Sequence, residues 1–303
     1  MEGLAKIAGD SGARRLRDAL LHGVERLAAA GIDSPRLDAE VLLADCLTMS
    51  REQLIVAGDE LIAPPVARRF DTLIARRLQR EPVAYITGKQ EFRSREFAVT
   101  PDVLIPRPDT ERLVEVALLW AAQLPACKPL RIADLCTGSG AVAVSLATEL
   151  PSAQFYATDI SPVALRIARG NAETHRVAER IKFIAGDLFG ALAPQPQVPF
   201  DLIVSNPPYV RRCEIVTLAP EVSRWEPRVA LDGGPDGLDF YRRIVAAAAD
   251  FLAEQGGLAM EMGADMTSEV LAICAETGRY REIEIFQDYA GRDRVVLARR
   301  GKN

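Results

Sequence analysis

The sequence predicts an α/β protein in which a doubly wound, mostly parallel sheet follows a small helical domain. Helical periodicity dominates the first 84 residues. From residue 128 onward strand and helix patterns alternate, and a glycine-rich turn follows the first of these strands. With 303 residues, of which 49% are hydrophobic, the chain can form more than one core. We therefore expect a helical domain over residues 1–84, a β-hairpin linker over 85–100 and an α/β domain over 101–303.

Three amphipathic helices are expected in the first domain. Apolar residues recur at helical spacing over residues 13–30. A second helix should begin at Ser34 and Pro35, an N-cap residue followed by a first-turn proline, and run to about residue 47. Its inner face is expected to hold Leu37, Val41 and Leu42. The third helix should follow the prolines at 64–65 and stop before Pro82, because a proline disfavours helical conformation in the residue before it.

The third helix carries a run of arginines. These are Arg68, Arg69, Arg76, Arg77 and Arg80. Such a run can bind an acidic partner, but it is also typical of a solvated helix face, so both interpretations stay open.

The pattern then changes to short alternating runs between residues 85 and 99, which predict a hairpin. A turn with two prolines follows at residues 105–111 and leads into a helix through Trp120.

Strands and helices alternate in the rest of the chain, which implies a parallel sheet with crossover helices. Strands are expected over residues 130–135, 154–158, 181–185 and 200–204, and helices over 141–150 and from Ser161. Residues 279–286 and 294–298 form two further strands. Their connection is too short for a crossover helix, so this pair should be antiparallel.

The glycine-rich turn is a candidate cofactor site and reads Asp134-Leu135-Cys136-Thr137-Gly138-Ser139-Gly140. Its glycines allow the backbone to approach a ligand, and adenine-nucleoside cofactors bind at the carboxyl ends of such strands. The segment from Gly138 to Ala143 also fits the dinucleotide pattern, with Asp159 at the end of the next strand. A dehydrogenase is therefore an alternative on this motif alone.

Two aspartates after the following strands are further candidates. Asp159 can accept hydrogen bonds from two ribose hydroxyls, or it can cap the helix that begins at Ser161. Asp187 can accept from an adenine amino group while Leu188 or Phe189 packs on the ring. The alternative for Asp187 is an ordinary turn aspartate.

The segment Ser205-Asn206-Pro207-Pro208-Tyr209 selects the chemistry, because an apolar strand ends there in a rigid turn. The Asn206 side-chain oxygen and the Pro207 carbonyl offer two acceptors for the two hydrogens of a planar NH2 group. Tyr209 offers a flat face for stacking. Since an amide nitrogen is a weak nucleophile, transfer to it would depend on orientation and electrostatics and needs neither a metal nor a strong base.

Composition excludes several other classes. The formal net charge of -5 argues against nonspecific nucleic-acid binding. Five cysteines without a close pair and only two histidines support neither a disulfide framework nor a zinc site. No secretory signal or long apolar run is present, so we expect a cytoplasmic protein with no membrane partner and no bound metal.

Together these motifs resemble the release factor glutamine methyltransferase family, also called HemK or PrmC, over nearly the whole chain. The turn with two prolines, Ile105-Pro106-Arg107-Pro108-Asp109-Thr110-Glu111, is the most specific part of the likeness. The segment from Glu226 to Gly234, followed by Asp236-Gly237-Leu238, supports it. The resemblance implies a class I methyltransferase fold with a seven-stranded sheet. It also implies a helical domain that helps hold the substrate, S-adenosylmethionine as cofactor, and N5-methylation of the Gly-Gly-Gln glutamine of peptide-chain release factors.

The resemblance also places the site residues. Expected cofactor contacts are Cys136, Thr137, Gly138, Ser139, Gly140, Asp159, Asp187, Leu188 and Asn206. Expected substrate contacts are Asn206, Pro207, Pro208 and Tyr209, of which Asn206, Pro207 and Tyr209 are assigned to catalysis. The family usually has glycine at the position of Cys136. If that backbone needs a positive φ angle, the cysteine is strained and cofactor affinity is affected. A redox role for Cys136 is conceivable, but a small tolerated side chain is the simpler interpretation.

Three alternatives remain beside the dehydrogenase, which would leave the Asn-Pro-Pro-Tyr segment unexplained. A nucleic-acid adenine or cytosine methyltransferase would share the acceptor geometry but should have a broad basic surface. An enzyme acting on ribosomal protein glutamine would lack only the Pro-Arg-Pro-Asp-Thr-Glu segment. A cofactor-binding module without catalysis is indicated by Cys136 alone.

Overall fold

The computed structural model describes residues 14–125, 128–193 and 199–301, and the chain divides into two compact units. The first unit comprises Met1–Gly88 with Ala219–Trp225, and the second comprises Lys89–Leu218 with Glu226–Asn303. Each unit is built around its own buried apolar residues.

The first unit is helical, and the three expected helices are confirmed. Its elements are β1 (Arg14–Arg15), α1 (Leu16–Ala29), α2 (Pro35–Leu47), α3 (Arg51–Val56), β2 (Leu61–Ile62), α4 (Pro64–Leu78), α5 (Val83–Thr87) and α9 (Pro220–Ser223). The expected inner face of α2 is wrong in one residue, because Leu37 is 45% exposed. The buried stripe runs instead through Ala39, Leu42, Leu43 and Cys46, which repeat at the spacing of one helix face.

The arginines of α4 pair mainly within the unit. The Arg77 guanidinium is 2.7 Å from the Asp38 carboxylate and 2.8 Å from Glu221, and Arg80 also reaches Glu221 at 3.2 Å. Arg69 and Arg76 pair with carboxylates at Asp45 and Glu81. These ion pairs favour the structural interpretation of the arginine run over the acidic-partner interpretation.

The hairpin is confirmed but is shorter than expected. Strands β3 (Lys89–Phe92) and β4 (Arg95–Ala98) pair antiparallel. Tyr85, expected at the start of the hairpin, lies in α5 instead. The short helix forms because Pro82 begins it and Gly88, with φ of 75°, ends it in the left-handed conformation.

Within the described residues the second unit is organised by a seven-stranded sheet of order β10-β11-β9-β8-β5-β6-β7. Its strands are β5 (Arg131–Leu135), β6 (Gln154–Asp159), β7 (Ile181–Ala185), β8 (Phe200–Ser205), β9 (Leu252–Glu261), β10 (Tyr280–Gln287) and β11 (Asp293–Arg300). The central pairs are parallel, whereas β11 is antiparallel to both β9 and β10. The expected antiparallel pair near the end of the chain is therefore confirmed.

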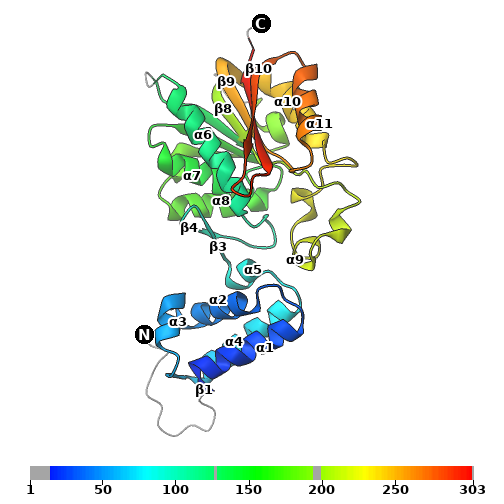
Figure 1. Ribbon diagram of the computed structural model, residues 1–303. Helices are drawn as coiled ribbons and strands as arrows, with labels where there is room; N and C mark the ends of the chain where they lie inside the picture. The colour runs from blue at the N-terminus through cyan, green and yellow to red at the C-terminus, as the bar shows by residue number, and fades with distance from the viewer. Residues whose placement is uncertain (1–13, 126–127, 194–198, 302–303) are drawn as a thin grey trace. The chain divides into compact units, whose positions relative to one another are not determined.

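Helices cover both faces of this sheet (Figure 1). They are α6 (Glu111–Gln123), α7 (Ala141–Glu149), α8 (Pro162–Thr174), α10 (Asp239–Phe251) and α11 (Thr267–Glu276). Strand side chains alternate between the two faces, so Ile132 joins the core under α6 and α7 while Ala133 joins the core under α10. This is the class I methyltransferase fold that the sequence predicted.

The order of strands creates the crevice for a ligand. From β5 the chain proceeds outward to β6 and β7, then returns to place β8 on the other side of β5. Ligands bind at the carboxyl ends of the strands where the order reverses. The glycine-rich turn after β5 and the Asn206 turn after β8 meet at this point.

Candidate active site

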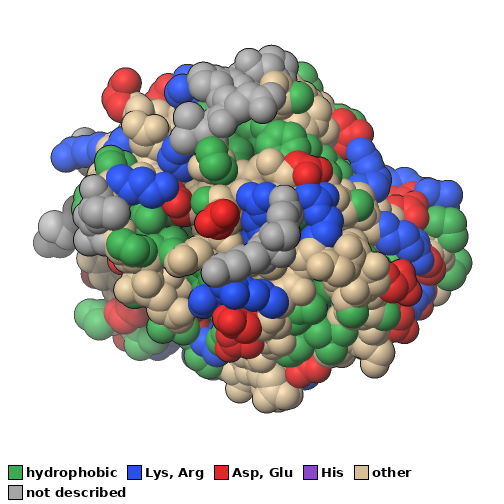
Figure 2. Space-filling view, turned by 90° about the horizontal axis from the view of Figure 1, so that it is seen from above, with side chains coloured by type: hydrophobic (Ala, Val, Ile, Leu, Met, Phe, Trp, Pro, Cys, Tyr) green, Lys and Arg blue, Asp and Glu red, His purple; other side chains and the backbone are tan. Residues whose placement is uncertain are grey.

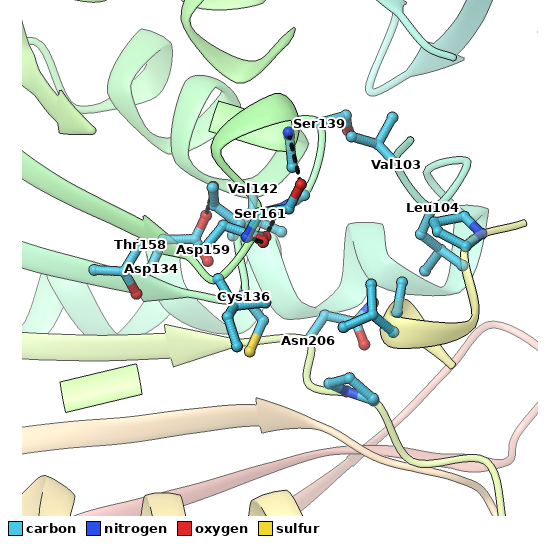
Figure 3. A pocket seen from close by; sticks show the side chains of 18 of the residues that line it. Val103, Leu104, Asp134, Cys136, Ser139, Val142, Thr158, Asp159, Ser161 and Asn206 are labelled. Carbon is cyan, nitrogen blue, oxygen red and sulfur yellow. Dashed lines mark hydrogen bonds between the residues drawn. The ribbon is translucent and has the colours of Figure 1, made fainter. Parts of the chain in front are cut away.

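A cavity lies at the carboxyl ends of β5, β6 and β8 and collects most of the expected site residues. It is lined by Cys136, Thr137, Gly138, Ser139, Asp159, Asp187, Leu188, Asn206 and Pro208, among others. Figure 3 shows Asp159, Cys136 and Asn206 around this space, with Val103 and Leu104 on its far side. Gly140, Pro207 and Tyr209 are not among the lining residues.

The glycine-rich turn after β5 has a backbone that few side chains tolerate. Cys136, Gly138 and Gly140 have φ angles of 60°, 55° and 81°. A Cβ on Gly140 would lie 2.9 Å from the Cβ of Ala168, so this glycine allows α7 and α8 to pack closely. The sequence condition for strain at Cys136 is therefore met, because this residue occupies the left-handed region. Burial and nearby carboxylates raise the pKa of the Cys136 thiol, which disfavours the thiolate that a redox role would need.

Asp134 supports the turn from below. Its side chain is 1% exposed and accepts a hydrogen bond from the Thr137 hydroxyl at 2.6 Å. Burial raises the pKa of Asp134 to about 7. Sequence reasoning had quoted this residue only as the start of the motif.

Asp159 combines the two roles that the sequence left open. Its Oδ2 accepts from the Gly138 backbone N–H at 2.9 Å, and its Oδ1 accepts from the Ser161 N–H at 2.8 Å. The Ser161 side chain then caps α8 through the Ala164 N–H. Each carboxylate oxygen of Asp159 keeps lone pairs for a ligand hydroxyl. Burial raises the pKa of this carboxyl group.

Asp187 has a protein partner that sequence reasoning missed. Its carboxylate lies 2.5 Å from the Arg243 guanidinium of α10, and both residues line the cavity. Leu188 lines the cavity as well, whereas the Phe189 ring stacks on Phe251 in the core. Of the two candidates for packing on an adenine, the structure thus brings Leu188 to the site.

The turn after β8 is held by partners from distant segments. The Asn206 Nδ2 donates to the Thr110 hydroxyl at 3.1 Å. The Tyr209 hydroxyl donates to Oε1 of the buried Glu261 at 3.3 Å. Tyr209 is half-buried, and its hydroxyl is directed toward β9. Neither Thr110 nor Glu261 was a candidate on the sequence alone.

The glycines of the segment from Glu226 to Leu238 pack against the same turn. The Gly233 N–H donates to the Val210 carbonyl at 2.9 Å, and the Val210 N–H donates to the Leu231 carbonyl at 2.9 Å. A Cβ on Gly233 would lie 2.7 Å from the Tyr209 Cα. Glycine is required here because the two backbones touch.

Arg107 and Glu226 join the two segments most specific to the resemblance. The guanidinium lies 2.6 Å from the Glu226 carboxylate, whose side chain is 1% exposed. Burial raises the pKa of Glu226 against the lowering effect of Arg107. Arg107, Pro227 and Val229 line the cavity, so the pair closes one wall of it.

The charged residues of the cavity favour a cationic ligand. Four aspartates, Asp102, Asp134, Asp159 and Asp187, line it with only Arg107 and Arg243 as lining cations. A pyrophosphate would face these carboxylates, so a dinucleotide fits poorly, whereas a nucleoside that carries a sulfonium fits well.

Other kinds of site find no support in the described residues. Among them, no group of three histidine, cysteine or acidic side chains is arranged to hold a metal. In the same part of the chain no helix is long and apolar enough to cross a membrane. Acidic and basic side chains lie interspersed on the face drawn in Figure 2.

Comparisons with protein families match both units. The PrmC N-terminal domain matches residues 18–88, and the methyltransferase small domain matches residues 115–221.

Full-length relatives give the same result. A release factor glutamine methyltransferase from Moorella thermoacetica is 47% identical over 285 residues, which cover 94% of this chain and 98% of that protein. Those from Geobacter sulfurreducens and Cereibacter sphaeroides are 44% and 42% identical, and the matches cover at least 91% of this chain and 93% of each relative. Among solved structures, the hMettl16 catalytic domain superposes with a TM-score of 0.57 at 15% identity. That match covers 81% of this chain and 84% of the other, and it shows the fold alone.

Proposed function

Because this chain belongs to the release factor glutamine methyltransferase family, we propose that it methylates the N5 amide nitrogen of the Gly-Gly-Gln glutamine in a peptide-chain release factor. The chain is an S-adenosylmethionine-dependent protein-glutamine methyltransferase of the class I fold. The observation that carries the proposal for the site is the position of Asn206. Its side chain lies at the end of β8 in the cavity wall, where its Nδ2 is already engaged by Thr110.

We infer that the cofactor is held by the residues around the glycine-rich turn. Asp159 would bind the ribose hydroxyls through the lone pairs that its two backbone N–H contacts leave free. Leu188 would pack against the adenine, and Asp187 would accept from its amino group beside Arg243. The bound cofactor supplies an electrophilic methyl group on a sulfonium, whose positive charge suits the carboxylates of the cavity.

Asn206 and Pro207 would orient the substrate nitrogen. The Asn206 Oδ1 and the Pro207 carbonyl each accept one hydrogen of the glutamine NH2 group, which fixes the direction of the nitrogen lone pair. Pro208 and Tyr209 would pack along the amide plane. Since the two acceptors hold both hydrogens, catalysis would come from proximity and electrostatics rather than from a strong base.

The helical part, expected over residues 1–84, would help hold the release factor, and the hairpin would link it to the catalytic part. We infer a cytoplasmic location from the protein substrate, which acts in translation. Neither a membrane nor a nucleic acid is proposed as a partner, because the net charge is -5 and the arginines of α4 are largely paired.

The Asn206→Ala variant tests the assignment. Removing the acceptor should lower kcat by about 100-fold or more, because the amide nitrogen loses its orientation. Affinity for S-adenosylhomocysteine, measured by calorimetry, should stay within about threefold, since the turn after β5 is untouched.

Cys213→Ala is the matched control, because this exposed residue lies just beyond the same turn and carries no proposed role. A normal kcat in Asn206→Ala would remove the central role of this residue.

A further inference from the structure

Thr110 lies between two polar groups that meet from different strands. It ends the Pro108–Thr110 turn and is 4% exposed. Its hydroxyl oxygen accepts from the Asn206 Nδ2 at 3.1 Å. It also hydrogen-bonds to Glu261, the last residue of β9.

Glu261 is buried behind the turn that holds Asn206. Its side chain is 1% exposed, and its Oε1 accepts from the Tyr209 hydroxyl at 3.3 Å. Its Oε2 is buried without a hydrogen-bond partner among the described residues. Arg294 and Asp109 are the charged neighbours, with opposite effects on this carboxyl group. A buried carboxylate in this position therefore contacts both polar side chains that fix the Asn-Pro-Pro-Tyr turn.

The direction of each hydrogen bond follows from proton counting. An ionised carboxylate only accepts, and a threonine hydroxyl has a single proton to donate. When that proton points to Glu261, the Thr110 oxygen can only accept from Asn206. The Asn206 amide must then present its Nδ2 to Thr110, and its Oδ1 is left free for a ligand. A flipped amide would place two acceptors against each other.

We propose that Thr110 and Glu261 are positioning residues that set the orientation of the Asn206 amide, so that its acceptor oxygen faces the substrate NH2 group. This inference rests on the proposed function and deepens it. The two residues act through Asn206 and touch neither substrate nor cofactor. Glu261 also holds the Tyr209 hydroxyl, so one carboxyl group aligns two side chains of the substrate turn.

The protonation state of Glu261 sets the conditions of a test. Burial raises its pKa to about 7, against the lowering effects of Thr110, Arg294 and Tyr209. Assays at about pH 8.5 therefore find the carboxylate ionised and the proposed hydrogen-bond directions in place.

Four variants separate positioning from simple structural support. Thr110→Val keeps the side-chain shape but removes the hydroxyl, whereas Thr110→Ser keeps the hydroxyl. Glu261→Gln keeps the shape but brings an NH2 group that can donate to Thr110 and so permit the amide flip. Tyr241→Phe is the matched control, because its buried hydroxyl bonds the backbone carbonyl of Glu261 at 3.0 Å and has no link to Asn206.

The readouts are kcat, the KM for a release factor and the affinity for S-adenosylhomocysteine. We expect Thr110→Val and Glu261→Gln each to lower kcat by about 10- to 100-fold, with KM and cofactor affinity within about threefold. Thr110→Ser and Tyr241→Phe should keep wild-type kcat. The Thr110→Val/Glu261→Gln double variant should be no slower than the slower single variant, because both changes act through one amide.

Three results would overturn the inference: wild-type kcat in Thr110→Val, a double variant whose loss is the product of the single losses, or loss of activity in Thr110→Ser. Thr110→Val decides the matter even if Glu261→Gln does not fold. Failure of the wild-type protein to methylate a release factor would instead reject the proposed function, and it is measured first.

Discussion

Asp134 gives a quantitative prediction about stability and pH. This carboxyl group is 1% exposed under the glycine-rich turn, and burial raises its pKa from 3.8 to about 7, with a smaller contribution from Asp159. The folded protein therefore holds this proton more tightly than the unfolded chain does. Its contribution to stability is complete below the unfolded pKa and is lost as the pH rises through the folded pKa.

The size of the effect follows from the two pKa values. Ionising Asp134 costs the folded state about 1 to 2 kcal/mol near pH 5 and about 4 kcal/mol near pH 8, a difference of about 2 to 3 kcal/mol. In Asp134→Asn the side chain cannot ionise, and its Oδ1 can still accept from the Thr137 hydroxyl. The pH-dependent loss of stability assigned to Asp134 should therefore disappear.

Thermal unfolding without cofactor measures this difference. On going from about pH 5 to about pH 8, the unfolding midpoint of Asp134→Asn should fall about 5 to 10 °C less than that of the wild type. Asp236→Asn is the control, because Arg242 holds the pKa of Asp236 at about 2, below the whole pH range. The same pH dependence in Asp134→Asn and in the wild type would refute the reasoning.

Two further predictions concern the turns of the site. Gly233→Ala should destabilise the protein by about 1 to 3 kcal/mol and lower kcat, because its Cβ would lie 2.7 Å from the Tyr209 Cα. Gly170→Ala, where a Cβ meets nothing within 4 Å, is the comparison in thermal unfolding and activity assays, and equal effects of the two substitutions would contradict this packing. Cys136→Gly should tighten S-adenosylhomocysteine binding with a stability change below about 1 kcal/mol, because relief of the positive φ offsets the added chain entropy of glycine. Cys136→Val should weaken binding in the same calorimetric titration, and unchanged affinity in both variants would show that position 136 is not strained.

Local patterns were sufficient for much of the fold. The strand, glycine-rich turn and helix around Gly138 could be predicted because each lies within a short segment. The antiparallel end of the sheet could be predicted from one short connection. In contrast, α10, β9 and α11 had no prediction. In β9 the polar run from Glu254 to Gly257 hides a strand whose second half is fully buried.

The partners of the site residues could not be predicted, because they come from remote segments. Thr110 lies 96 residues from Asn206, and Arg243 lies 56 residues from Asp187. The sequence marked the Pro-Arg-Pro-Asp-Thr-Glu segment only through a family resemblance. In the structure, Arg107 pairs with Glu226 and Thr110 pairs with Asn206. The assignments to Pro207 and Tyr209 stay predictions.

Mass spectrometry of a release factor after incubation with the wild-type protein and S-adenosylmethionine tests the central claim most directly. We expect one added methyl group on the Gly-Gly-Gln glutamine, with none on a factor in which that glutamine is alanine and none on oligonucleotides. Methylation of the oligonucleotides, or an unmodified release factor under conditions where the cofactor binds, would contradict the account.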